Sequence, residues 1–281
     1  MEALSLAGRA SCWWMIFRIA LAERLAYRGD FALGTLMRFL PIITQIFLWA
    51  AVFESVGGGS ANASLAGYTL PDMIAYYLLS MLARAFSSMP GLASTVAKQI
   101  REGEIKKFLV QPIDMIGFLL LGRLAHKTAY YTIATLPFAL VFYLCRDYFA
   151  RGWPSPEIMT AFVISCCLGF LIGYFLDLCI GLIGFWFLEV SSLLFIYMLL
   201  NFFLSGHMFP LDLLGEPWKT IVDYLPFKYM AYFPAAIFLG KIPADQLWYQ
   251  LAAEGVWLVV LVAAARLLYA GGLKRYSGYG G

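Results

Sequence analysis

The chain has 281 residues, of which 62% are hydrophobic and only 13% are charged. Soluble domains usually carry about 25% charged residues, so this composition excludes an ordinary soluble domain and favours a chain that lies in a membrane. The formal net charge of +3 is too small to favour nucleic acid as a partner.

The first segment, residues 11–28, is interrupted too often by charge to span a bilayer. On a helical wheel an apolar stripe of Trp13, Phe17 and Leu21 lies opposite most of the charged side chains. Such a helix lies in the membrane interface or packs on the cytoplasmic ends of a helix bundle, and both can hold together. The charged arc consists of Arg9, Glu23, Arg24 and Arg28, with Arg18 as the exception.

Six apolar blocks are long enough to cross about 30 Å of hydrocarbon at about 1.5 Å per residue. We therefore predict an all-α integral membrane protein with six transmembrane helices, forming a single transmembrane domain over residues 1–281. Only Glu189 separates the fourth block from the fifth, which predicts a very tight turn there. The blocks are residues 31–56, 71–90, 115–145, 158–188, 190–209 and 247–270.

Lys and Arg near the ends of these blocks set the orientation. With the N-terminus in the cytoplasm, the inner segments hold about twice as many Lys and Arg as the outer loops. Both termini, including the tail at 271–281, are expected on the cytoplasmic side.

Residues 98–114 form an inner loop that predicts a short amphipathic helix. Glu102 and Lys106 are spaced four apart, Gly103 allows a break before the helix, and Pro112 stops it. An apolar face projecting into the cytoplasm needs a cover, which is either another protein or the membrane surface. The face consists of Ile105, Phe108 and Leu109.

The stretch at 210–243 is apolar and aromatic but is divided by prolines into pieces too short to cross. Such pieces enter a membrane only where protein covers their free backbone groups. We expect a re-entrant pair of helices or a cap over the outer face. The prolines are Pro210, Pro217, Pro226 and Pro234.

Four motifs follow one another on this six-span pattern. They are Arg101-Glu102-Gly103-Glu104-Ile105 with Gln111-Pro112-Ile113-Asp114, Ser205-Gly206 with Phe209-Pro210-Leu211, Leu225-Pro226-Phe227-Lys228-Tyr229 with Phe233-Pro234 and Leu239-Gly240, and Lys274-Arg275-Tyr276 with Gly278-Tyr279-Gly280. Together they resemble the ABC type-2 (ABC-2) exporter permeases, and most closely a small bacterial subgroup of ABC transporter membrane subunits. The resemblance covers essentially the whole chain.

The resemblance implies the membrane (permease) subunit of an ATP-binding cassette exporter in the cell inner membrane. It implies that residues 11–28 are an interfacial elbow, that 98–114 is a coupling loop resting on a separate ATPase, and that 210–243 forms short outer helices. Two permease subunits, the same or homologous, would pair around a central path and carry two ATPase copies and an unidentified exported substrate. The coupling residues would be Arg101, Glu102, Glu104, Ile105, Lys106, Lys107, Phe108 and Leu109.

The chain has no GxxxxGK[ST] phosphate loop, because the Gly215 to Thr220 stretch lacks the glycine before the lysine. ATP hydrolysis, with its ATP and Mg, is therefore expected on the partner, and this chain is expected to bind no cofactor and to be no enzyme. An ATP-independent secondary transporter or channel is the alternative. A membrane enzyme is less favoured, because the two histidines, His126 and His207, fall on opposite sides of the membrane and no metal site is expected.

Ionisable groups inside spans are functional candidates because a membrane makes them expensive. Arg84 and Asp177 fall at similar depth and are predicted to form a buried pair between spans two and four. Alternatively, Arg84 lies on the transport path or reaches the membrane surface. Arg38 and Glu254 are also placed inside spans. The candidate path residues are Tyr76, Tyr77, Arg84, Phe195, Asn201, Phe202 and Phe203, although aromatic residues make up 17% of the chain and will line almost any surface.

Small residues in the fourth span point to close helix packing. Gly169 and Gly173 form a GxxxG pattern, for which packing within the subunit is the first interpretation and dimerisation the second. The five cysteines form no CxxC pair and are expected to be small buried hydrophobic side chains.

Overall fold

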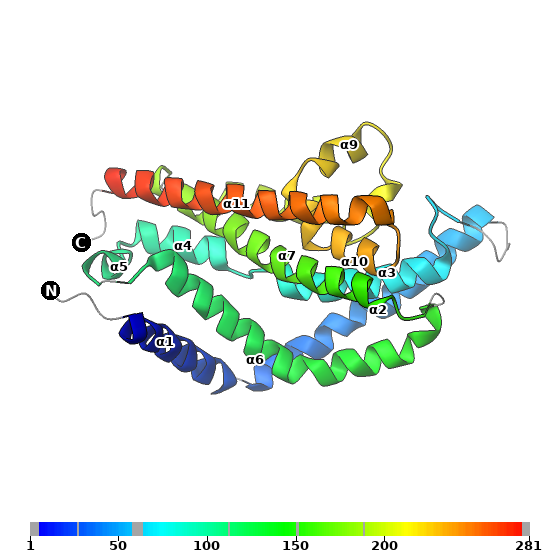
Figure 1. The fold of residues 1–281 in the computed structure, drawn as a ribbon, viewed down its shortest axis with the longest axis horizontal. Helices are drawn as coiled ribbons and strands as arrows, with labels where there is room; N and C mark the ends of the chain where they lie inside the picture. The colour runs from blue at the N-terminus through cyan, green and yellow to red at the C-terminus, as the bar shows by residue number, and fades with distance from the viewer. Residues whose placement is uncertain are drawn as a thin grey trace. The chain divides into compact units, whose positions relative to one another are not determined.

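The computed structural model describes residues 6–26, 28–57, 64–111, 113–149, 152–187 and 189–276. Helices make up most of this part of the chain (Figure 1), and its only β-type pairing is a single bridge between Leu65 and Tyr68. The predicted all-α class is therefore confirmed. Pro112 and the tail motif at 278–280 lie outside the described residues, as do the side chains of Arg9, Arg28 and Arg38.

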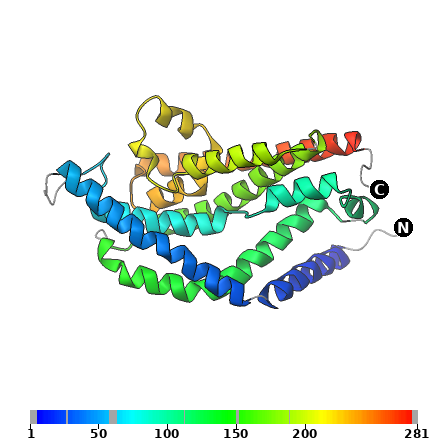
Figure 2. The same cartoon turned by 180° about the vertical axis from the view of Figure 1, so that it is seen from behind.

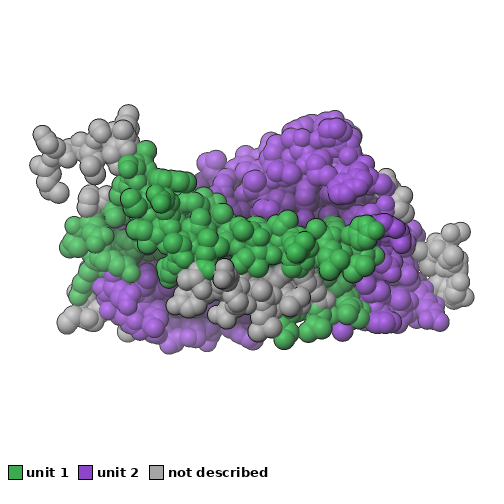
Figure 3. Space-filling model, turned by 90° about the horizontal axis from the view of Figure 1, so that it is seen from below, with its two compact units in different colours: residues 1–43, 105–144 green, residues 44–104, 145–281 purple. Residues whose placement is uncertain are grey.

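Two compact units make up the chain (Figure 3). Unit 1 consists of Met1–Ile43 and Ile105–Leu144, and unit 2 consists of Thr44–Glu104 and Cys145–Gly281. The helix α2 (Arg28–Gly57) passes from unit 1 into unit 2 shortly after Pro41.

In unit 1, α1 (Leu6–Ala26) packs along α6 (Met115–Leu144). Trp13 lies against Gly117, where an added β-carbon would come within 3.2 Å of the indole ring. The predicted apolar stripe of Trp13, Phe17 and Leu21 is half-buried, as a face packed on another helix requires. The bundle-packing interpretation of this segment therefore has direct support.

The other face of α1 is mixed rather than purely polar. Arg18, Glu23 and Arg24 are exposed there, and so are large apolar side chains. Exposed apolar and charged groups on one helix suit the boundary between lipid and water, so the interfacial interpretation also stands. The exposed apolar side chains are Trp14, Met15, Ile19 and Leu25.

In unit 2, α7 (Pro156–Leu182) is the central helix. Ser155 caps its start by accepting a hydrogen bond from the backbone N of Ile158 at 3.4 Å, and Pro156 follows where a missing N–H costs nothing. Four helices pack on α7 (Figure 1): α3 (Leu70–Ser87), α4 (Leu92–Arg101), α10 (Tyr232–Phe238) and α11 (Ala244–Arg275).

Glycines let these neighbours approach α7 at backbone distance. A β-carbon added at Gly169 would lie 2.7 Å from the carbonyl oxygen of Tyr229, and one at Gly181 would lie 2.8 Å from that of Ala93. Gly173 faces the carbonyl of Ser87 in the same way. The predicted GxxxG pattern therefore serves packing within unit 2.

The connection between α7 and the next long helix differs from the predicted tight turn at Glu189. The α-helix ends at Leu182 and a single 3-10 turn, η2 (Ile183–Phe185), follows, before α8 (Ser191–Leu204) begins. Glu189 accepts a hydrogen bond from the backbone N of Ser191 at 2.8 Å, which satisfies a free donor at the start of α8. The connection is longer than predicted because the apolar run continues to about residue 188, whereas the α-helix ends at Leu182, where Gly181 and Gly184 lower the helical propensity.

Short helices fill the stretch after α8, and each has a proline at its N-cap or within its first turn. They are η3 (Leu211–Leu213), α9 (Trp218–Asp223), η4 (Pro226–Met230) and α10. Proline fits these positions because the first turn of a helix has no acceptor for its N–H.

Two described helices, Pro156–Phe185 and Ala244–Arg275, are long and apolar enough to cross a membrane by themselves. Leu40–Val56 and Ser191–Leu204 are apolar but shorter. Helices lie at all six predicted blocks, whereas the crossing of the bilayer by all six remains a prediction. Two further helices complete the described elements, α5 (Lys106–Val110) and the 3-10 turn η1 (Arg146–Tyr148).

All five cysteines are free. Cys166 is buried, as expected, but Cys12 and Cys167 are exposed, so the expectation of burial is wrong for these two. Both lie on apolar helices whose outer faces are themselves uncovered.

Candidate functional site

A chain of three hydrogen bonds joins α3, α8 and α7 inside unit 2. Arg84 Nη1 donates to Asn201 Oδ1 at 2.8 Å. Asn201 Nδ2 then donates to Tyr197 Oη at 3.2 Å, and Tyr197 Oη donates to Asp177 Oδ1 at 2.5 Å. We call these four residues the polar relay.

The polar relay connects the two residues that the sequence predicted as a pair. Arg84 lies within electrostatic reach of Asp177, and the hydrogen-bonded route between them runs through Asn201 and Tyr197. A positive charge at one end and a negative charge at the other leave the group neutral overall. Neutrality matters in a membrane segment because an uncompensated charge there is expensive.

Tyr197 is the member that the sequence did not reveal. Asn201 and Tyr197 stand four residues apart on α8, so they share one face of that helix and are its buried side chains. That spacing from Asn201 was the available signal. It was hidden by the abundance of aromatic residues in the chain.

The predicted path residues do not form one surface. Tyr76 is fully buried and its hydroxyl donates to the carbonyl oxygen of Gly206 at 2.5 Å. Tyr77 is also buried, and Phe202 packs against His207, as Tyr77 does. By contrast, two residues of α8, which runs across the face seen in Figure 2, are largely exposed. They are Phe195 and Phe203, at 58% and 50%.

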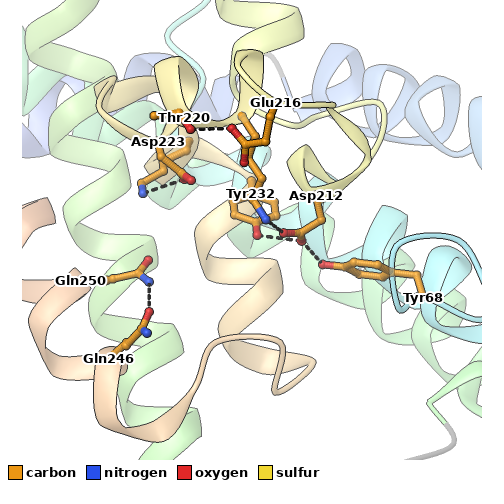
Figure 4. A network of polar contacts seen from close by, with 10 residues as sticks. Tyr68, Asp212, Glu216, Thr220, Asp223, Tyr232, Gln246 and Gln250 are labelled. Atoms are coloured by element: carbon orange, nitrogen blue, oxygen red, sulfur yellow. Dashed lines mark hydrogen bonds and ion pairs between the residues drawn. The ribbon is translucent and has the colours of Figure 1, made fainter.

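A second polar group surrounds Asp212 in the stretch that follows α8 (Figure 4). Lys219 Nζ lies 2.9 Å from Asp212 Oδ1, and two tyrosine hydroxyls donate to Oδ2, from Tyr68 at 2.8 Å and Tyr232 at 2.7 Å. We call these four residues the Asp212 cluster. It joins the loop before α3 to η3, α9 and α10, and Tyr68 and Asp212 stand 144 residues apart in the sequence.

Electrostatics hold Asp212 in its charged form. Burial alone would raise its pKa, but the hydrogen bonds from Lys219, Tyr232 and Tyr68 outweigh burial and lower the pKa below its usual value. The same hydrogen bond to Asp212 raises the pKa of Lys219. Burial, followed by the nearby Tyr232 and Asp212, raises the pKa of Tyr68, so its hydroxyl remains a donor.

A third contact fixes the start of α3. Lys241 Nζ lies 2.9 Å from Asp72 Oδ2, donates to the carbonyl oxygen of Gly67 at 2.7 Å, and stands 4.3 Å from the centre of the Tyr68 ring. Thr69 and Asp72 form a capping box at the same helix end. Tyr68 thereby connects this contact to the Asp212 cluster.

The coupling loop predicted at 98–114 begins as a helix and is broken where the sequence suggested. The helix α4 ends at Arg101, Gly103 adopts a left-handed φ of 76°, and the short helix α5 follows. The predicted Glu102–Lys106 spacing is wrong as a helical pair, because the break lies between them. Glu102 instead lies 3.9 Å from Lys98, one turn back on α4.

The apolar face predicted for this loop is divided between inside and outside. Ile105 is 0% exposed, and the ring of Phe108 packs against Phe118 at 5.4 Å. Leu109 and Val110 are 47% and 83% exposed. Leu109 and Val110 are therefore the apolar side chains of this loop that another molecule could contact. Of the two, only Leu109 belongs to the apolar face predicted from the sequence.

The remaining predicted coupling residues are all exposed. Arg101 Nη1 lies 3.8 Å from Glu189 Oε2 and so ties the end of α4 to the connection that precedes α8. The others are Glu102, Glu104, Lys106 and Lys107. Among the described residues no group of three or more His, Cys, Asp or Glu side chains could hold a metal ion.

The described chain is thus an α-helical protein with apolar helices, a neutralised charge relay between them and an exposed loop at residues 101–111, features that suit a membrane transport subunit. The model of the family described as "ABC-2 family transporter protein" matches residues 39–280. The chain belongs to this family, and the resemblance seen in its motifs is confirmed. No curated protein sequence matches the chain.

Membership has three direct consequences. The chain is a membrane protein, it is a transport subunit rather than an enzyme, and its family implies association with an ABC ATPase and the lipid bilayer.

Proposed function

We propose that this chain is the permease subunit of an ATP-binding cassette exporter, which forms the transport path and couples to a separate ATPase. The family match over residues 39–280 carries the proposal. The absence of a GxxxxGK[ST] phosphate loop from the sequence supports placing ATP and Mg on the partner. In this arrangement the six apolar helices cross the inner membrane with both termini in the cytoplasm.

The contact with the ATPase is assigned to the end of α5. Leu109 and Val110 present an uncovered apolar surface, and Lys106 and Lys107 stand exposed on the same short helix. An apolar centre with charges beside it is the usual anatomy of a protein contact, in which the charges set the register. Ile105 and Phe108 support this surface from inside the chain rather than touching the partner.

Movement would pass from α4 into the rest of unit 2 through close packing. Gly181 brings α7 to backbone distance from α4, and Arg101 ties the end of α4 to Glu189. Asp177, on the same α7, begins the polar relay to α8 and α3. About one turn beyond Arg84 on α3, Ser87 donates to the carbonyl oxygen of Met230 at 2.7 Å, which links α3 to η4.

A second permease subunit, the same or homologous, would complete the path, and two ATPase copies would drive it. Support comes from α8, whose exposed face carries Phe195, Ile196, Met198 and Phe203 while only one stripe is buried. Of the candidate path residues, Phe195 and Phe203 are then the ones placed to meet a substrate. Export is the direction that the family resemblance supports.

The test uses the full chain, tagged and co-expressed with the ABC ATPase that co-purifies with it. Leu109→Asp and Val110→Asp should each reduce recovery of the ATPase by about tenfold, as expected when roughly 1.4 kcal/mol of binding is lost. Gln111→Asp is the matched control, because it adds the same charge at an exposed neighbouring position without removing an apolar side chain. Substitutions at Ile105 or Phe108 are poor probes, since they disturb the fold itself.

Unchanged recovery of the ATPase with both Leu109→Asp and Val110→Asp would remove the coupling assignment. Substrate movement by the purified chain in vesicles without any ATPase would favour the secondary transporter instead.

A further inference from the structure

Glu254 is a buried acid that takes no part in the relay or in either outer contact. Its side chain is 0% exposed, and it lies about ten residues, or roughly 15 Å, along α11 from Ala244. Within the described residues neither carboxylate oxygen has a hydrogen-bond partner. An ionised carboxylate in such surroundings is strongly disfavoured, because no hydrogen bond replaces those it would make with water.

The facing helix supplies a matching group. Ser165 on α7 is also 0% exposed, its Oγ is buried without a hydrogen-bond partner in the described chain, and it lies within interaction range of the Glu254 carboxyl. The helices α7 and α11 pack along each other within unit 2 (Figure 1). The two carboxylate oxygens of Glu254 and the Oγ of Ser165 therefore lie near one another in the contact between α7 and α11, and none of the three has a hydrogen-bond partner in the described chain.

The other described groups around Glu254 supply no compensating charge. Cys166 of α7 and Tyr229 of η4 are within electrostatic reach of it, and both side chains are neutral near pH 7. Lys228, the cation of η4, lies 3.1 Å from Asp223, and η2 consists of Ile183, Gly184 and Phe185, none of which titrates.

We propose that Glu254 and Ser165 form a proton-binding site between α7 and α11, and that the bound proton holds the two helices together. The proton comes from water and returns to it. With the proton in place, the acid O–H donates to Ser165 Oγ and the serine hydroxyl can donate to the other acid oxygen. Without it, a single serine donor faces a full negative charge, and the α7–α11 contact must open or admit water.

This inference goes beyond the proposed permease function and does not depend on it. It needs neither the ATPase nor a substrate, so it can fail while the coupling assignment stands. Equally, it can hold if the chain proves to be a secondary transporter.

The first experiment probes the neutral acid chemically. Dicyclohexylcarbodiimide, which is soluble in the bilayer, adds to protonated carboxyl groups and leaves ionised ones unmodified. In the full chain reconstituted in vesicles at about pH 7, peptide mass spectrometry should find the adduct on Glu254 and not on Glu157, an exposed acid at the outer end of α7. Glu254→Gln should abolish the adduct. No adduct on Glu254 between about pH 5 and about pH 9 would overturn the proposal.

The second experiment does not depend on access of the reagent. Unfolding exposes Glu254 to water, where it ionises, so raising the pH above the usual value for Glu favours the unfolded state. Glu254→Gln imitates the neutral acid and should melt at a higher temperature than the wild type at about pH 9, with the two midpoints converging at about pH 5. A Gln variant that melts at or below the wild-type temperature at about pH 9 would overturn the proposal.

Discussion

The polar relay and the Asp212 cluster use the same parts in opposite surroundings. Each contains one acid and one cation, with one tyrosine hydroxyl in the relay and two in the cluster. In the relay, the cation and the acid are held apart by two neutral side chains within apolar helices. In the Asp212 cluster, Lys219 touches the acid directly and its side chain is 37% exposed. We expect water to replace a lost partner more readily in the cluster than between the apolar helices of the relay, so the two should respond differently to the same substitutions.

The largest effect is expected where the relay is left with one charge. Asp177→Asn keeps a hydrogen-bond acceptor for Tyr197 but removes the charge that balances Arg84. Breaking a fully buried pair costs about 3–5 kcal/mol, and the partly buried Arg84 and Asp177 should lose somewhat less. Thermal unfolding of the purified chain in lipid nanodiscs would measure it. The double variant Arg84→Gln with Asp177→Asn should be less destabilised than the sum of the single variants, and simple additivity would show that the two charges are not coupled.

A smaller effect is expected from the corresponding change in the outer cluster. Asp212→Asn loses a charge-assisted bond from Lys219 and weakens those from Tyr68 and Tyr232, for about 1–3 kcal/mol. Lys219 can then turn to water. The same unfolding assay applies, and a loss as large as that of Asp177→Asn would contradict the comparison drawn between the two groups.

Lowering the pH should remove the stability that the Asp212 cluster contributes to the folded chain. Because the pKa of Asp212 is lowered in the folded chain, its stabilisation is present above the usual Asp value and is lost as the pH falls through the folded value. The unfolding midpoint should therefore drop as the pH falls below about 4, and Asp212→Asn should show a smaller drop over that range. Identical pH profiles for the variant and the wild type would remove the assignment.

The smallest effect is expected from single hydroxyls. Tyr232→Phe removes one hydrogen bond to Asp212 while Tyr68 and Lys219 remain, so the loss should be about 0.5–1.5 kcal/mol. Tyr224→Phe is the control, because Tyr224 is 76% exposed and its removal should change little. Equal losses for the two variants would mean that the buried hydroxyl contributes nothing beyond the ring.

The sequence predicted what is set by local pattern. The apolar blocks predicted where the long helices lie. The prolines indicated where the short helices after α8 begin, because proline fits the first helical turn. The local pattern did not predict features that depend on which part of the chain, or which other molecule, packs against a given apolar face. The apolar run through Gly184 hid the end of α7 at Leu182, and the amphipathic face at Ile105 could cover this chain or another with the same pattern.

The polar relay shows the same limit at the site. Arg84 and Asp177 stood out because charge is rare in apolar segments, and Asn201 was marked by its polarity. Tyr197 carried no such mark in a chain that is 17% aromatic. The sequence alone marks Glu254 as an acid within an apolar block, but the pairing of Glu254 with Ser165 depends on which faces of α7 and α11 meet.

The two glycines that bracket α4 have a consequence for how this chain can vary in length. Gly91 and Gly103 both adopt left-handed φ, at 72° and 76°, so the chain enters and leaves the helix through turns that other residues rarely allow. Each residue inserted between them would turn the departing chain by about 100° around the helix axis. The number of residues in α4 therefore sets the direction in which the chain leaves toward α5, and a one-residue insertion there should be more harmful than most substitutions.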